Sequence, residues 1–196
     1  MSMAAMNPFM GELIQTSVPG VTCSWVQEAN YGIAPVAISN TAVLVSTTLT
    51  AQIQTITTGI TNPDVARNVV VKGAVATSTG GVVVTGTDYA GVSLNETIAL
   101  SGTAIVVGLK AFATVTQVVL PVTSGAGDGV SVGVGSKLGL PFTLAKNTVR
   151  IAFNNNVLES TAPTVAVDAI NICNNTVTLA SALAGNAINV YVVVPG

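Results

Sequence analysis

The stretch RNVVVKGAVATSTGGVVVTGTDYAGVSLNETIAL, residues 67–100, decides the fold class. In residues 67–76 and 92–100 apolar side chains recur at every second position, and residues 82–87 are rich in Val and Thr. A period of two is typical of a β-strand that buries one face. Two segments containing glycine separate the runs, and glycine supplies the positive φ that a tight hairpin turn needs. The stretch therefore predicts three consecutive antiparallel strands.

The same pattern continues on both sides of this stretch, and helical periodicity is nearly absent after Ile14. Strands that recur about every ten residues, with Gly and Asn turns between them, indicate an antiparallel β-sandwich or barrel. We therefore expect an all-β fold of about ten short strands. Outside the opening stretch, these are expected at residues 51–56, 104–107, 111–120, 130–134, 138–144, 149–153, 166–172, 176–179 and 188–194.

The chain divides into three segments by composition. Residues 1–48 contain no Lys or Arg and are expected to form an N-terminal arm with at most one short helix, capped by Asn7 with Pro8 in its first turn. Residues 49–145 are expected to form the β-domain, and residues 146–196 to add strands packed on it. Two arrangements of the arm remain open: it lies across another molecule, or it folds back on its own domain.

Charge is the most unusual property of the composition. Only 7% of the 196 residues are charged, with 6 basic and 8 acidic side chains, whereas about a quarter is ordinary in soluble domains. A net charge near zero gives little protection against contact between copies. We therefore expect much of the surface to be covered by further copies or by a host lattice. The alternative is a monomer whose surface is made of Thr, Ser and Asn.

Several classes of protein are disfavoured by the same composition. The chain combines 49% hydrophobic residues with a net charge of −2, which is not typical of disorder. Its apolar runs are far shorter than a membrane-spanning helix needs, and it has no basic patch for nucleic acid. We therefore expect neither a membrane nor a nucleic acid as partner.

The residue types needed for catalysis are scarce. There is no histidine, which removes Ser-His-Asp relays and His-based zinc sites, and the acids are scattered singly along the chain. The loop Gly125–Gly129 lacks the Lys-Ser/Thr ending of a phosphate loop, so we expect it to be a hairpin bend in which Asp128 accepts backbone hydrogen bonds. We expect no catalytic residues, no metal, no cofactor and no enzymatic activity.

Glu96 is the most informative acidic residue. It interrupts an otherwise apolar strand face, and a buried carboxylate is costly unless it is paired. Lys110 and Arg67 lie on neighbouring expected strands and are its candidate partners, within the sheet or across a subunit boundary. The alternative is a position at the rim, near solvent. Together with Glu96, the bulky residues of the arm are candidate interface residues: Phe9, Met10, Leu13, Trp25 and Tyr31.

A series of short motifs lies between residues 60 and 145, at residues 60–73, 84–91, 96–103, 110–115, 127–128 and 137–141. In their order along the chain, these motifs resemble virion structural proteins of tailed bacteriophages.

The resemblance implies a structural role on the phage particle, on the head surface. We expect a decoration or cement protein that forms homo-oligomers, with a trimer as the form suggested by such architectures, and that contacts the major capsid protein. One alternative is a head-fibre or tail component that binds a host-surface glycan. Another is a pilus-like subunit, which the lack of a secretory signal pattern in Met1–Val18 disfavours.

Overall fold

The computed structural model describes residues 24–31 and 34–195, with side chains described from residue 34 to residue 193. This part of the chain contains fourteen β-strands and one short 3-10 helix, η1 (Ile172–Asn174). The strands form three sheets in which every pair is antiparallel. The all-β class predicted from the sequence is confirmed.

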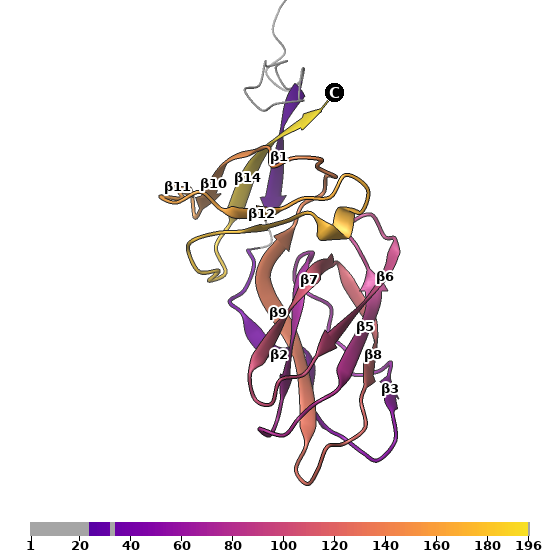
Figure 1. The fold of residues 1–196 in the computed structure, drawn as a ribbon. Helices are drawn as coiled ribbons and strands as arrows, with labels where there is room; N and C mark the ends of the chain where they lie inside the picture. The colour runs from indigo at the N-terminus through magenta and orange to yellow at the C-terminus, as the bar shows by residue number, and fades with distance from the viewer. Residues whose placement is uncertain (1–23, 32–33, 196) are drawn as a thin grey trace, which may run out of the picture.

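Two of the sheets face one another in the lower part of the molecule (Figure 1). The first has the order β3-β8-β5-β6, and the second has the order β12-β13-β9-β4-β7 with β2 also paired to β9. Valines at alternate positions of the strands point inward from both sheets and fill the space between them. The residues that recur with a period of two in the sequence therefore form the core. The first sheet contains β3 (Gln54–Ile56), β5 (Gly81–Thr87), β6 (Ser93–Ala99) and β8 (Thr114–Leu120). The second contains β2 (Ser39–Thr48), β4 (Arg67–Gly73), β7 (Ile105–Phe112), β9 (Gly129–Gly139), β12 (Thr164–Ala166) and β13 (Thr176–Thr178).

The third sheet lies at the other end of the molecule, where the C-terminus also lies (Figure 1). Its order is β1-β14-β10-β11, so the first described strand pairs with the last. A second hydrophobic core packs under it, and it includes Leu138 at the end of β9 and Val177 of β13. The strands are β1 (Ser24–Tyr31), β10 (Val149–Asn154), β11 (Val157–Leu158) and β14 (Ile188–Pro195).

Strand β9 connects the two cores. It is the longest strand, with 11 residues, and runs from the lower end of the sandwich towards the third sheet (Figure 1). Val130, Val132 and Val134 pack in the first core, whereas Leu138 packs in the second. The same strand therefore fixes the position of each core relative to the other.

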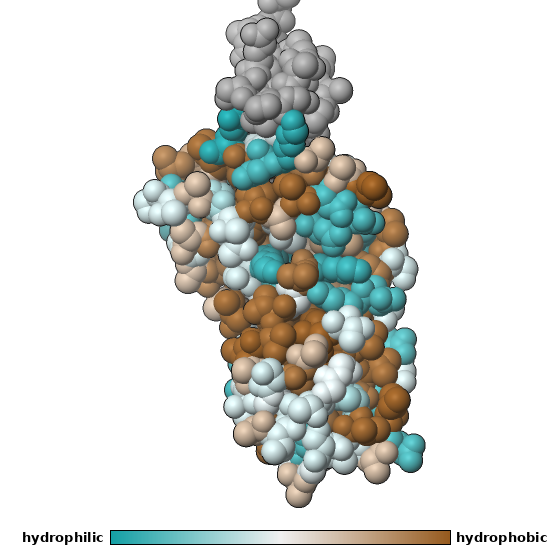
Figure 2. Space-filling model, in the orientation of Figure 1, coloured by the Kyte–Doolittle hydropathy of each residue, from teal (hydrophilic) through white to brown (hydrophobic). Residues whose placement is uncertain are grey.

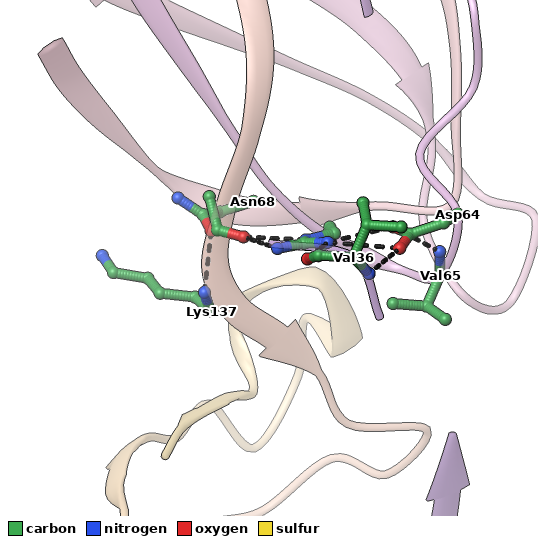
Figure 3. A network of polar contacts seen from close by, with 7 residues as sticks. Val36, Asp64, Val65, Asn68 and Lys137 are labelled. Carbon is green, nitrogen blue, oxygen red and sulfur yellow. Dashed lines mark hydrogen bonds and ion pairs between the residues drawn. The ribbon is translucent and has the colours of Figure 1, made fainter. Parts of the chain in front are cut away.

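The side chain of Asn68 hydrogen-bonds to backbone groups at two β-bulges, one in each of the strands that pair with β4. Opposite Val69, β7 has the three residues 108–110, and opposite Asn68, β9 has the three residues 135–137. Such bulges leave backbone groups outside the regular ladder. Asn68 is fully buried, and its Oδ1 accepts a hydrogen bond from the backbone N–H of Lys137 at 2.9 Å (Figure 3). Its Nδ2 donates to the carbonyl of Gly108 at 3.1 Å. One amide thus satisfies groups from both neighbouring strands.

The adjacent Arg67 is also fully buried, at the junction between the cores. Its Nε donates to the carbonyl of Gly135 at 2.7 Å, and its Nη1 donates to the carbonyl of Val36 at 3.0 Å and to Asp64 at 3.1 Å. Burial lowers the pKa of Arg67, while the hydrogen bond and the negative charge of Asp64 act in the opposite direction. Asp64 also accepts the backbone N–H of Val36 at 2.7 Å (Figure 3), so this ion pair fastens the segment before β2 to β4.

The segment expected to be an N-terminal arm contributes two strands. β1 pairs with β14, and β2 pairs with β9 and buries Val43 and Leu44 in the first core. Of the two arrangements left open by the sequence, the described residues from Ser24 onward adopt the second: they fold back on their own molecule. The expected helix at residues 7–14 lies outside the described residues, and the boundary at residue 48 stays a prediction.

Some strand bounds differ from those expected. The strand expected at 51–56 is confined to Gln54–Ile56, and the one expected at 166–172 ends at Ala166 and is followed by η1. In that segment the side chains of Asp168 and Asn175 form hydrogen bonds with neighbouring backbone groups, which are then not available for pairing with another strand. The strands expected at 104–107 and 111–120 are β7 and β8, which Ala113 separates.

We predict that Asn68→Ala lowers the free energy of unfolding by about 2–4 kcal/mol, because the Lys137 amide and the Gly108 carbonyl lose their amide partner. Urea unfolding followed by circular dichroism measures this. The matched control is Asn95→Ala on the exposed side of β6, for which we expect a change within about 0.5 kcal/mol. Equal effects of the two substitutions would contradict the role assigned to Asn68.

Candidate interaction surface

Glu96 joins the edges of the two sandwich sheets. β6 ends the first sheet and β7 ends the second, and Glu96 reaches from one to the other. Its Oε1 accepts the backbone N–H of Leu109 at 2.6 Å, and its Oε2 accepts that of Lys110 at 3.2 Å. Both amides belong to the bulge in β7, so the carboxylate satisfies donors that the bulge removes from the ladder.

This arrangement differs from the ionic contact expected from the sequence. Arg67 pairs with Asp64 instead, and the ammonium of Lys110 donates to the carbonyl of Asn95 at 2.9 Å. Glu96 does share the inward face of β6 with buried Leu94 and Ile98, as expected, and it is half-buried. A Cβ at Gly108 would lie 2.8 Å from Oε2 of Glu96, so the absence of a side chain there makes room for the carboxylate.

The outward side of β7 presents a row of bulky aliphatic side chains. Ile105, Val107 and Leu109 are 47%, 47% and 68% exposed, and they alternate with residues that are half-buried or buried. Hydrophobic surface gathers across the middle of the face in Figure 2, in the region where Figure 1 places β7 and β2. We call Ile105, Val107 and Leu109 the β7 row.

The surroundings of the β7 row combine two lysines with neutral residues: Lys72 lies opposite Ile105, and Lys110 follows Leu109. The exposed residues of the neighbouring strand β6 are Ser93, Asn95, Thr97 and Ala99, all uncharged. Strand β7 pairs with β4 on one edge, and its other edge faces β6 through Glu96. An exposed apolar row at the end of a sheet is typical of a surface that contacts another protein.

A second feature is a groove of about 600 Å³ between the β5–β6 turn and the segment around η1. Asp88 shapes one wall, because its Oδ1 accepts the backbone N–H groups of Ala90 and Val92, each at 2.9 Å. The predicted turn at residues 88–91 is thereby confirmed. Both polar and apolar side chains line the groove. The polar ones include Asn95, Lys110, Asn171 and Asn174, and the apolar ones include Ala90, Val92, Leu94, Ile170 and Ile172.

Asp168 organises the opposite wall of the groove. Its carboxylate accepts the backbone N–H groups of Ile170 and Asn171 at 2.8 and 2.9 Å, and the side-chain amide of Asn174 at 2.7 Å. The backbone N–H of Asn171, then the amide of Asn174 and the backbone of Ile170, hold the pKa of Asp168 well below its usual range.

The expected loop at residues 125–129 contains Asp128 in the role predicted. Its carboxylate accepts the backbone N–H groups of Ser124 and Gly129, each at 2.9 Å, and the hydroxyl of Ser78. Burial acts to raise the pKa of Asp128, but these hydrogen bonds outweigh it and lower the pKa below its usual value.

The other candidate interface residues lie at or beyond the limit of what the structure describes. Phe9, Met10 and Leu13 are outside the described residues. The backbones of Trp25 and Tyr31 pair with Val194 and Ile188 in the third sheet, and their side chains are outside the described part. The interface role of these five residues and of Glu96 stays a prediction.

The β7 row was not found from the sequence. The strand itself was expected, but alternation alone does not say which side faces solvent in a segment that is apolar on both sides. Within the described side chains, no group of three or more Cys, Asp or Glu residues could hold a metal ion. The described segments also contain no helix long and apolar enough to span a membrane.

Comparison of the chain with protein-family models, with curated protein sequences and with solved structures finds no match.

We predict that Glu96→Ala accelerates amide hydrogen exchange at Leu109 and Lys110 and lowers the free energy of unfolding by about 1–3 kcal/mol, because both N–H groups lose their acceptor. Glu96→Gln retains a side-chain acceptor and should have a smaller effect. NMR-detected exchange measures this at single residues. Unchanged exchange at both amides in Glu96→Ala would refute the bulge-capping role.

We predict that Asp168→Asn reduces the acid sensitivity of the protein. Because its pKa is depressed in the folded state, Asp168 stabilises the fold above its unfolded pKa, and this contribution is lost as the pH falls through the folded pKa. Below about pH 4, the free energy of unfolding should therefore fall less steeply in Asp168→Asn than in the wild type. Urea unfolding between about pH 6 and pH 2 measures both slopes; identical slopes would contradict the assignment.

Proposed function

We propose that this chain is a structural protein of a tailed-phage particle, a decoration or cement protein on the head surface. It forms homo-oligomers, with a trimer as the expected form, and contacts the major capsid protein. The β7 row is the observation on which an assembly role rests, since three bulky aliphatic side chains stand exposed at the end of a sheet. The assignment to phage rests on the resemblance in residues 60–145.

The low charge of the chain supports the same proposal. A protein with 7% charged residues has few groups that must stay in water, so covering its surface requires little desolvation of ions. Full burial of one Val, Leu or Ile side chain contributes about 1.5–3 kcal/mol. Covering the exposed half of three such side chains contributes a few kcal/mol per copy, and a shell repeats this contact over many copies.

The fold suits a role in which the protein is under mechanical tension. Its strands are held in three antiparallel sheets, and Glu96 joins the edges of the sandwich sheets. The third sheet brings the first and last described strands together, so tension applied near either end of the described chain acts on the β1–β14 ladder. We propose that the cement role depends on this ladder as well as on the β7 row.

Imaging of the particles that contain this chain tests the location. We expect density for the sandwich on the head lattice, at positions that bridge neighbouring capsid subunits. A position on the neck, the tail or a protruding fibre would overturn the cement role.

A second candidate function is glycan binding by a head-fibre or tail component. The groove beside η1 favours it, because Asn95, Asn171 and Asn174 offer amides of the kind that hydrogen-bond to sugar hydroxyls. Its lining contains no aromatic side chain for stacking on a sugar ring, which makes it the weaker candidate. A glycan array probed with the purified full chain tests it, and specific binding lost in Asn171→Ala would favour it.

We predict that Leu109→Asp abolishes or strongly weakens binding to capsids that lack this protein, because it places a charge at the most exposed side chain of the proposed contact. Co-sedimentation with such capsids measures this, and light scattering measures self-association of the same variant. The matched control is Leu158→Asp on β11, where the side chain is 54% exposed in the third sheet.

The control should bind as the wild type does. Equal binding by Leu109→Asp, with its circular dichroism spectrum unchanged, would exclude the β7 row as the contact surface. A wild-type chain that is monomeric and does not bind capsids would exclude the cement role itself.

A further inference from the structure

A small pocket on the outer face of the second sheet is lined mainly by small and polar residues, among them one lysine. Its volume is about 290 Å³, several times the ~30 Å³ share of one water molecule. The pocket is lined by Asn40, Thr41, Ser46, Lys72, Gly73, Ala74, Thr103 and Ser131. No carboxylate is among these lining residues.

Lys72 provides the positive charge of this pocket. It is half-buried on β4, directly opposite Ser131 of β9 and Ile105 of β7 in the strand registers. Within the described residues its ammonium has neither a hydrogen bond nor an ion pair, in contrast to Arg67, Lys110 and Lys137, whose side chains all donate to oxygen atoms. A half-buried ammonium without a partner favours an anion as its neighbour.

The neutral groups of the pocket are also unsatisfied. Ser131 is 7% exposed, and its hydroxyl makes no hydrogen bond to any described residue. Oδ1 of Asn40 is buried and has no partner in the described structure. A half-turn of the amide exchanges its oxygen and nitrogen, so Asn40 can present a donor in the same place. Buried polar groups are normally hydrogen-bonded, and Oδ1 of Asn40 is a buried atom without a partner among the described residues. Together with the half-buried Lys72 and the hydroxyl of Ser131, which have no partners in the described part of the chain, it indicates a ligand.

We propose that this pocket is a carboxylate-binding site, in which Lys72 supplies the charge and Ser131 and Asn40 supply hydrogen bonds to the carboxylate oxygens. One cation matches the single negative charge of a carboxylate, whereas a phosphate dianion would leave one charge uncompensated in a half-buried position. The site stands on its own geometry and does not depend on the phage assignment.

The carboxylate has two sources: a free small carboxylate, or an Asp or Glu side chain of a protein that covers the β7 row. The second source is favoured by position, because Lys72 pairs with Ile105, the first residue of that row. A partner that buries the row then brings a carboxylate to Lys72 at the edge of the same contact, where a charge pair sets orientation as well as affinity.

The first experiment titrates the full chain with sodium acetate and follows backbone amide shifts by NMR, with sodium chloride at equal ionic strength as reference. We expect saturable shifts at Gly73, Ala74, Thr103 and Ser131 with acetate and none with chloride. In Lys72→Met we expect binding at least about tenfold weaker, because a charge-assisted hydrogen bond is lost. Lys146→Met, which removes an exposed lysine outside the pocket, should bind as the wild type does.

Ser131→Ala provides a second variant that keeps all charges, and we expect it to weaken acetate binding several-fold. If Lys72→Met does not fold, Ser131→Ala alone tests the proposal. The absence of saturable acetate shifts in the wild type, or equal binding by the wild type and both variants, would overturn the proposal.

Capsid co-sedimentation then distinguishes the two sources. If the carboxylate belongs to the partner, Lys72→Met weakens capsid binding and acetate competes with it. If the ligand is a free carboxylate, acetate binds at the pocket while capsid association is the same in the wild type and Lys72→Met. Both outcomes support a carboxylate site in this pocket. If the acetate titration shows no such site, the test of the β7 row by Leu109→Asp is unaffected.

Discussion

The side-chain amide of Asn68 is the constraint on which the rest of the structure depends. β4 lies between β9 and β7 in the second sheet, and both of these neighbours bulge where Asn68 and Val69 face them. Without Asn68, the backbone N–H of Lys137 would lose this acceptor, and the carbonyl of Gly108 would keep the ammonium of Lys137 as a donor at 3.3 Å but lose the amide. Asn68 satisfies both, so it holds β7 and β9 in their registers at once.

Each of the two bulges has a consequence elsewhere in the molecule. The bulge in β9 turns the carbonyl of Gly135 towards Arg67, and beyond it the strand enters the second core, so the third sheet is placed by the same irregularity. The bulge in β7 frees the amides of Leu109 and Lys110 for Glu96, which joins the sandwich edges. With this edge occupied by a carboxylate, the outward side of β7 is the apolar surface left for a partner to cover.

Much of the fold class followed from local pattern, whereas the candidate surfaces did not. Alternation in residues 67–100 and the glycine turns predicted β4, β5 and β6, because the period of a strand and the φ of a turn are local properties. β1 and β2 were missed because their residues show no clear alternation. Glu96 was recognised as unusual, but its acceptor role arises from a bulge that no alternation reveals.

The sequence by itself determined an all-β chain of low charge with one anomalous carboxylate, since these depend on composition and on contacts between near neighbours in the chain. Only the tertiary structure decided that β1 pairs with β14, that Glu96 binds backbone amides and that Lys72 stands beside unsatisfied Ser131 and Asn40. These contacts join segments far apart in sequence. Their geometry depends on strand register and on the position of bulges, and both are fixed by the packing of the whole sheet rather than by any one segment.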